Sequence, residues 1–140
     1  MAGYSGTPLI QKLGIKPNST VVAINPPSAY RKLLGPGANS VEFQDTVTTS
    51  AGFVHLFVTT RSDLKKNLRQ LRRKIADSGV LWISWPKKSS GVRTDLTEDI
   101  VRAIALPLDF VDVKVCAVDE IWSGLKLVIR REHRKPEGKT

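Results

Sequence analysis

Three short segments of this chain are almost continuously apolar, and this feature restricts the fold more than any other. They read STVVAI at residues 19–24, FVHLFVT at residues 53–59 and VLWISW at residues 80–85. A strand can be apolar on both sides only where helices cover both faces of its sheet, which is typical of parallel sheets. The pattern therefore predicts a parallel sheet between two layers of helices.

Amphipathic segments between these strands supply the predicted helices. The strongest covers residues 62–77, with Gly79 as its stop, and its apolar stripe consists of Leu64, Leu68, Leu71 and Ile75. Shorter helices are predicted at residues 8–13, 26–34 and about 95–106. Their predicted N-terminal caps are Thr7, Asn25 and the capping-box pair Asp95 and Glu98.

Two longer strands close the chain, at residues 110–119 and 124–131, and only a short turn separates them. A parallel crossover needs a helix-sized connection, so these strands are predicted to form an antiparallel hairpin at one edge of the sheet. The whole pattern predicts a single-domain, Rossmann-like α/β three-layer sandwich with a mostly parallel sheet. This architecture resembles a shortened form of the S-adenosylmethionine methyltransferase fold. The strand order around residues 41–58 stays open, because the segment at 44–52 is too short for a helical crossover.

The composition agrees with a single α/β domain and argues against a disulfide-bonded, zinc-binding or membrane-spanning protein. One domain is predicted over residues 1–133, followed by a flexible basic tail at residues 134–140. Cys116 is the only cysteine and there are two histidines, which excludes an internal disulfide and a four-ligand zinc site. No apolar run is long enough for a membrane span and the N-terminus lacks a signal-peptide pattern, so we expect a cytoplasmic protein without membrane contact.

Residues 21–30, VVAINPPSAY, are similar to the motif with which DNA adenine methyltransferases hold an extruded base. In that motif an aromatic residue directly follows the prolines, whereas here Ser28 does and Tyr30 comes two positions later. The glycine-rich turn of a Rossmann nucleotide site is also missing after this strand. The stretch is therefore interpreted as structural, with Tyr30 as a candidate wall of a crevice.

The loop at residues 85–99, WPKKSSGVRTDLTED, is the leading candidate for a ligand site. Ligands of open α/β sheets bind beyond the carboxyl ends of the strands, and cations with small residues and a helix N-terminus suit a phosphate or carboxylate. The competing interpretation is that the acids at the helix start pair with these cations. The predicted ligand-binding residues are Tyr30, Trp85, Lys87, Lys88, Ser89, Gly91, Arg93 and Thr94.

The helix predicted at residues 62–77 also carries much of the positive charge. Residues 61–77 contain seven basic and two acidic residues, a net charge of +5 in a chain of net charge +9. No aromatic residues interleave with the cations, so the pattern indicates phosphate contact without base stacking, or else a solvated helix face. The candidate nucleic-acid-binding residues are Lys65, Lys66, Arg69, Arg72 and Arg73.

The remaining reactive and aromatic side chains have structural interpretations for the most part. His55 is predicted to be a satisfied core or edge histidine, Cys116 a packed thiol and Trp82 a core residue, while Trp85 and Trp122 are candidates to border a ligand. No catalytic residue and no metal ligand are predicted.

Four motifs carry a resemblance to a known family: WPKK, TDLTED, VDVKVCAVDE and WSGLK, together with GYSGTPLIQKLGIK near the start. On these, the chain resembles a family of small bacterial proteins with a domain of unknown function, over residues 3 to about 133. The resemblance implies a compact cytoplasmic protein and supplies no activity, cofactor or catalytic residue.

Three functional hypotheses follow. The leading one is a non-enzymatic binding module for an anionic ligand, such as a nucleotide or phosphate, at the carboxyl edge of the parallel sheet. The first alternative is nonspecific association with nucleic acid or an acidic protein through the basic helix, in a transcription-related role. The second alternative is a degenerate S-adenosylmethionine-methyltransferase-like enzyme. The cofactor and the oligomeric state are left open.

Overall fold

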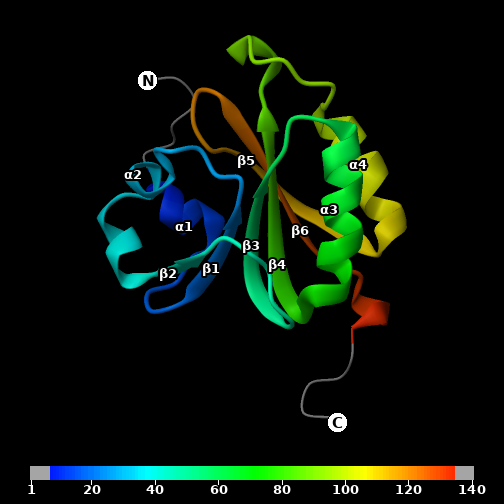
Figure 1. The fold of residues 1–140 in the computed structure, drawn as a ribbon, viewed down its shortest axis with the longest axis horizontal. Coiled ribbons are helices and arrows are strands. Elements are labelled where there is room, and N and C mark those ends of the chain that lie inside the picture. The colour runs from blue at the N-terminus through cyan, green and yellow to red at the C-terminus, as the bar shows by residue number, and fades with distance from the viewer. Residues whose placement is uncertain (1–6, 135–140) are drawn as a thin grey trace.

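The computed structural model describes residues 7–134, and its centre is one six-stranded sheet with strand order β2-β1-β3-β4-β6-β5 (Figure 1). The strands are β1 Thr20–Ile24, β2 Glu42–Gln44, β3 Ala51–Phe57, β4 Ile75–Pro86, β5 Phe110–Ala117 and β6 Trp122–Ile129. Strands β1 to β4 pair in parallel, and β6 pairs antiparallel with both β4 and β5. The predicted α/β fold with a C-terminal antiparallel hairpin is confirmed. Of the tail predicted at residues 134–140, residues 135–140 lie outside the described residues, as do residues 1–6.

Helices cover both faces of this sheet (Figure 1). The helices are α1 Leu9–Leu13, α2 Tyr30–Leu34, α3 Arg61–Lys74 and α4 Glu98–Ala105, with short 3-10 turns η1 Pro36–Ser40, η2 Lys88–Ser90, η3 Leu106–Leu108 and η4 Arg131–His133. Helices α1 and α2 lie on one face, and α3 and α4 lie on the other. No helix within residues 7–134 has the length and apolar character needed to cross a bilayer.

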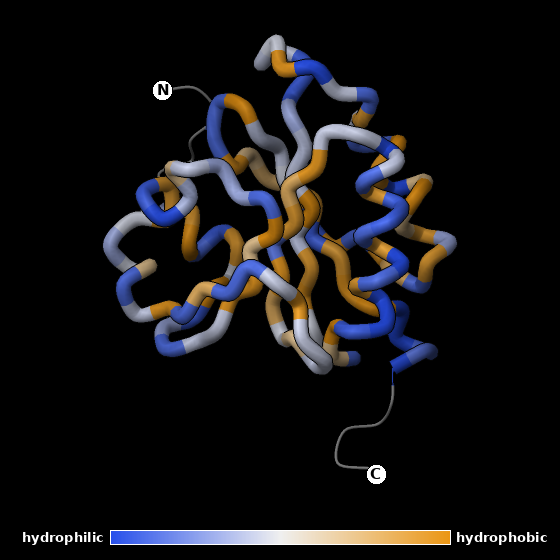
Figure 2. Tube along the Cα trace, viewed as in Figure 1, coloured by the Kyte–Doolittle hydropathy of each residue, from blue (hydrophilic) through white to orange (hydrophobic). Residues whose placement is uncertain are grey.

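Alternate residues of the central strands enter two separate cores. In β3, Val54 and Leu56 pack with the buried leucines of α3, whereas Phe57 packs with α1 and α2. Figure 2 shows hydrophobic residues concentrated along these central strands. Successive side chains of a strand point to opposite faces, so an almost uninterrupted apolar run is needed to fill both cores.

The junction between α3 and β4 differs from the prediction. Helix α3 ends at Lys74, and Ile75 already begins β4, so Gly79 lies inside a strand and is not a helix stop. A Cβ atom at Gly79 would lie 2.7 Å from Cγ1 of Ile75 and 3.0 Å from the carbonyl oxygen of Ala51. Glycine is needed here because two backbones approach closely, which a sequence pattern cannot separate from a helix end.

The predicted helix caps are also corrected. Helix α1 has Pro8 at its N-cap in place of Thr7, and α2 begins only at Tyr30, so Asn25 caps no helix. Helix α4 begins at Glu98. Its N-cap is Thr97, whose side chain accepts a hydrogen bond from the Ile100 amide. Asp95 instead accepts a hydrogen bond from the Arg61 amide at 2.8 Å, which ties the loop to the start of α3 and leaves no capping box.

The short segment between β2 and β3 resolves the strand order that the sequence left open. Strand β2 lies at the edge, beside β1, and β3 pairs with the other side of β1. The connecting residues cross β1 without a helix, and Val47 packs against the core on the α3 and α4 side. A six-residue segment of bends and turns, residues 45–50, thus takes the place of a crossover helix, which makes the fold a shortened one.

Candidate functional site

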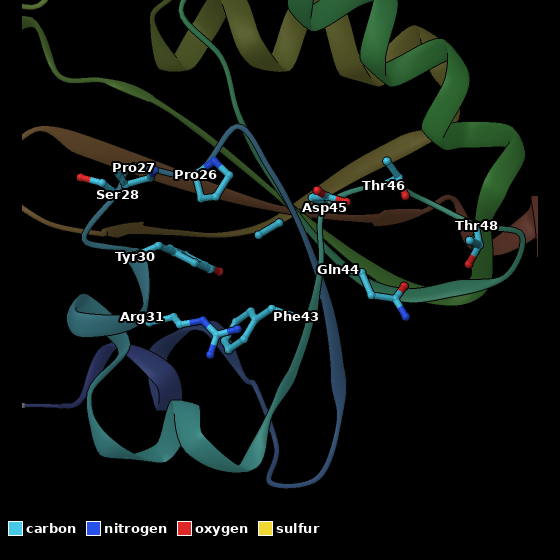
Figure 3. Close-up of a pocket in the computed structure, with 11 residues that line it drawn as sticks. Pro26, Pro27, Ser28, Tyr30, Arg31, Phe43, Gln44, Asp45, Thr46 and Thr48 are labelled. Carbon is cyan, nitrogen blue, oxygen red and sulfur yellow. The ribbon is translucent and has the colours of Figure 1, made fainter.

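An open cavity of about 690 Å³ lies at the carboxyl ends of β1 and β2 (Figure 3). Its volume falls within the range of small-molecule sites, and the position matches the ligand edge of open α/β sheets. The walls come from the turn after β1, from the start of α2 and from the end of β2 with the loop behind it. The lining residues are Ala23, Pro26, Pro27, Ser28, Tyr30, Arg31, Phe43, Gln44, Asp45, Thr46 and Thr48.

The turn after β1 makes a tight bend without glycine. Asn25 has a φ of 54°, in the left-handed region that asparagine tolerates better than most residues. In Rossmann nucleotide sites the first glycine provides the tight turn at this point. Asn25 supplies the bend, but Pro26 and Pro27 have no N–H group to donate to a ligand.

Asp45 lines the cavity across from the turn after β1 (Figure 3). It directly follows Gln44, the last residue of β2. It comes twenty residues after Asn25. Rossmann sites place an acidic residue about twenty residues beyond the glycine turn, where it binds ribose hydroxyls. Asp45 therefore has the position and the chemistry of a ribose-binding residue. Sequence reasoning missed it, although an acid after a short strand at this spacing was a usable signal.

Behind the cavity wall, three polar side chains form a hydrogen-bonded chain through the core. The Tyr30 hydroxyl lies 2.8 Å from Nδ1 of His55, and Nε2 of His55 lies 2.8 Å from the Ser84 hydroxyl. His55 and Ser84 are fully buried, and Tyr30 is 4% exposed. Burial lowers the pKa of His55 to about 3 and raises the pKa of Tyr30. His55 is therefore neutral near pH 7 and, as predicted, is a satisfied core residue that fixes Tyr30.

Aromatic rings make the same wall rigid. The Tyr30 ring meets Phe43 and Phe57 edge to face, at centroid distances of 6.0 and 5.5 Å. The Arg31 guanidinium carbon lies 4.6 Å from the centre of the Phe43 ring, so the cation stays beside the cavity without a carboxylate partner among residues 7–134. Figure 3 shows Tyr30, Arg31 and Phe43 together on one side of the cavity.

The predicted ligand residues of the 85–94 loop do not join this cavity. Trp85 is 4% exposed and packs into the core under α3 and α4. The Lys87 ammonium donates to the Asp119 carbonyl at 2.6 Å, and the Thr94 hydroxyl donates to the Thr59 carbonyl at 2.6 Å. The others are exposed along the loop around η2: Lys88, Ser89, Gly91 and Arg93. Of the predicted set, only Tyr30 lines the cavity.

The predicted nucleic-acid residues lie on α3, on the other face of the sheet. Lys65, Lys66, Arg69 and Arg73 border a shallow hollow on this helix. Arg72 differs from them, because its Nε lies 3.4 Å from the Asp109 carboxylate.

The remaining candidates have structural surroundings. Trp122 is half-buried and meets Phe57 edge to face at 5.1 Å, on the α1 and α2 side of the sheet. Cys116 packs against the same core, and burial raises the pKa of its thiol. Within residues 7–134, no cluster of histidine, cysteine, aspartate or glutamate is suited to a metal ion.

The comparisons with known proteins are informative at the level of the fold. No protein-family model matches the sequence, and no similar curated sequence was found, so the family resemblance stays a prediction. The fold is similar to that of a SAM-dependent methyltransferase from Aquifex aeolicus, with 14% identity, 86% of this chain and 87% of that chain covered, and a TM-score of 0.57. The structure of DhpI in complex with SAH is 10% identical in sequence to this chain, and the match covers 87% of this chain and 82% of that chain with a TM-score of 0.57. A TehB-like SAM-dependent methyltransferase from Corynebacterium glutamicum is 7% identical in sequence to this chain, and the match covers 87% of this chain and 85% of that chain with a TM-score of 0.50.

These matches confirm the predicted likeness to a shortened methyltransferase-type fold. They overturn the leading hypothesis of a non-enzymatic module for an anionic ligand, because solved structures with this fold include SAM-dependent methyltransferases. The geometry also argues against that hypothesis, because the cations of the 87–93 loop, which it assigned to the ligand, do not line the cavity. The methyltransferase-like alternative fits the findings better.

Proposed function

We propose that this chain is a methyltransferase-like enzyme that binds the adenosyl group of S-adenosylmethionine in the cavity at the ends of β1 and β2. The observation that carries the proposal is Asp45, which stands across the cavity from the β1 turn at the spacing of a ribose-binding acid. The fold supports it, since similar structures include those of SAM-dependent methyltransferases.

The lining residues fit the separate parts of this ligand. Asp45 can accept hydrogen bonds from the ribose hydroxyls, and the ring of Phe43 with Pro26 offers an apolar surface to adenine. When bound, S-adenosylmethionine would supply an electrophilic methyl group on its sulfonium.

The two prolines set a limit on how the ligand is held. A glycine-rich turn offers backbone N–H groups to a ligand, and neither Pro26 nor Pro27 has one. Recognition should therefore rest on the ribose and adenine, so adenosine alone should retain much of the binding free energy.

Replacing Asp45 with asparagine should weaken S-adenosylmethionine binding at least tenfold. A hydrogen bond to a charged group contributes about 1.5–3 kcal/mol, and asparagine keeps the shape but loses the charge. Isothermal titration calorimetry measures the change. Glu42→Gln is the matched control, because Glu42 is an exposed acid three positions before Asp45 that does not line the cavity. The glutamine keeps a side-chain oxygen that can accept the hydrogen bond from Gln44, which does line the cavity.

Equal affinities of the wild-type protein and the Asp45→Asn variant would refute the role of Asp45. Loss of binding in both variants would assign the effect to net charge. If the wild-type protein binds neither S-adenosylmethionine nor adenosine at millimolar concentrations, the proposed function is wrong.

A further inference from the structure

The outer side of α3 has a hollow of about 520 Å³ that is lined only by polar and charged residues. Its lining residues are Ser62, Lys65, Lys66, Arg69, Gln70 and Arg73. The hollow does not share a lining residue with the cavity at β1 and β2. Helix α3 also lies across the sheet from α2 (Figure 1), so this surface is independent of the proposed function.

The cations of this hollow differ from Arg61 and Arg72 of the same helix, because they lack partners within residues 7–134. Arg61 donates from Nε to the Asp95 carbonyl at 3.0 Å, and Arg72 pairs with Asp109. By contrast, none of the cations that line the hollow makes an ion pair or side-chain hydrogen bond with another residue of the 7–134 range: Lys65, Lys66, Arg69 and Arg73. All four are exposed, so their charges are free to meet an external anion.

The spacing of these cations favours an extended polyanion. Lys65, Arg69 and Arg73 recur every four residues, so they form a row about 12 Å long on one side of the helix. Double-stranded DNA carries about seven phosphate charges over the same length. A row of cations can therefore contact several phosphates at once, which a single small anion cannot exploit.

The polar character of the hollow distinguishes nucleic acid from a protein partner. Protein interfaces have an apolar centre, and no apolar residue lines this hollow. Single-stranded nucleic acids need aromatic platforms, and the hollow contains no aromatic residue. Arginine, lysine, serine and glutamine are all residues that contact phosphates.

We propose that this surface, defined by Lys65, Lys66, Arg69 and Arg73 with Ser62 and Gln70, binds the phosphate backbone of double-stranded nucleic acid without reading its sequence. A hollow with apolar residues lies on the α4 side of Lys65 and Arg69 and includes Ile100, Ile104 and Leu108. An acidic protein would also contact that apolar surface, so a substitution there tests whether the partner is an acidic protein.

The test measures the fluorescence anisotropy of a labelled, mixed-sequence duplex DNA with the full chain. Contact with about four phosphates predicts a slope of about −3.6 for log affinity against log salt, or roughly 100-fold weaker binding at about 200 mM than at about 50 mM salt. The variant K66E/R69E/R73E should bind at least tenfold more weakly at low salt. The control K16E/K32E/R131E changes the net charge equally through exposed residues outside α3 and should bind within about threefold of the wild-type protein.

Three results would overturn the assignment. The first is unchanged affinity in the α3 variant, provided that circular dichroism shows that it is folded. The second is an equal loss in the control, which would assign binding to net charge. The third is equally tight binding of polyglutamate that is lost in Ile104→Ser, which would identify an acidic protein as the partner class.

Discussion

Acidification from about pH 7 to about pH 4.5 is expected to lower the free energy of unfolding by about 2.5 kcal/mol through His55 alone. His55 is fully buried, and its only side-chain hydrogen-bonding partners in residues 7–134 are the neutral hydroxyls of Tyr30 and Ser84. Burial lowers the pKa of His55 to about 3, whereas the unfolded chain protonates it near pH 6.5. Below pH 6.5 the unfolded state binds a proton that the folded state excludes, so stability is lost as the pH falls.

Urea unfolding at several pH values measures this loss. The window between pH 6.5 and pH 4.5 is the useful one, because Asp109 and Asp112 have lowered pKa values and lose their stabilising charge only in more acidic solution. The variant His55→Gln removes the titrating group. The difference between its pH dependence of stability and that of the wild-type protein cancels the contributions of all other titrating groups. An equal pH dependence in the two proteins would show that His55 is not the buried neutral group described above.

Replacement of Trp82 by alanine is expected to lower the free energy of unfolding by about 4 kcal/mol. Trp82 is fully buried, and its indole N–H donates to the Leu13 carbonyl at 2.9 Å, a bond between residues 69 positions apart. The alanine variant would leave a cavity against Gly124 and an unpaired carbonyl at the end of α1. Helix α1 should then detach from the sheet before the other helices.

Chemical unfolding of two further variants makes this prediction specific. Trp82→Phe keeps most of the ring but loses the hydrogen bond, and it should cost about 2 kcal/mol. Trp122→Ala removes the same type of residue from a half-buried position and should cost clearly less than Trp82→Ala. If Trp82→Phe has wild-type stability, the bond to Leu13 does not hold α1 in place.

The sequence predicted the sheet well because its signals are local. Apolar runs such as residues 80–85 require two covered faces, and the short turn before β6 leaves only an antiparallel pairing. Gly79 and Asn25 were misassigned for a different reason. The same residue type serves a helix end, a close backbone approach or a left-handed bend, and only the tertiary contacts decide among them.

The candidate site was harder to predict because it depends on strand order. The cavity exists where β2 lies beside β1, and the pairing of residues 20–22 with residues 42–44 could not be deduced from the short connection behind β2. The loop at residues 85–99 was predicted instead because it carries three cations, but its Lys87 donates to a backbone carbonyl in the fold. Tyr30 was found because it follows a strand end, and Asp45 was missed because the place of the short strand before it, next to β1, was left open.

The most direct test of the central claim is an amide NMR titration of the full chain with S-adenosylhomocysteine, which cannot donate a methyl group. If the cavity at the ends of β1 and β2 is an adenosyl site, shifts should concentrate at residues 25–31 and 43–48 and saturate with one equivalent. Asp45→Asn should reduce them, and Glu42→Gln should not. Shifts confined to residues 87–94, or no shifts at millimolar ligand, would contradict the account.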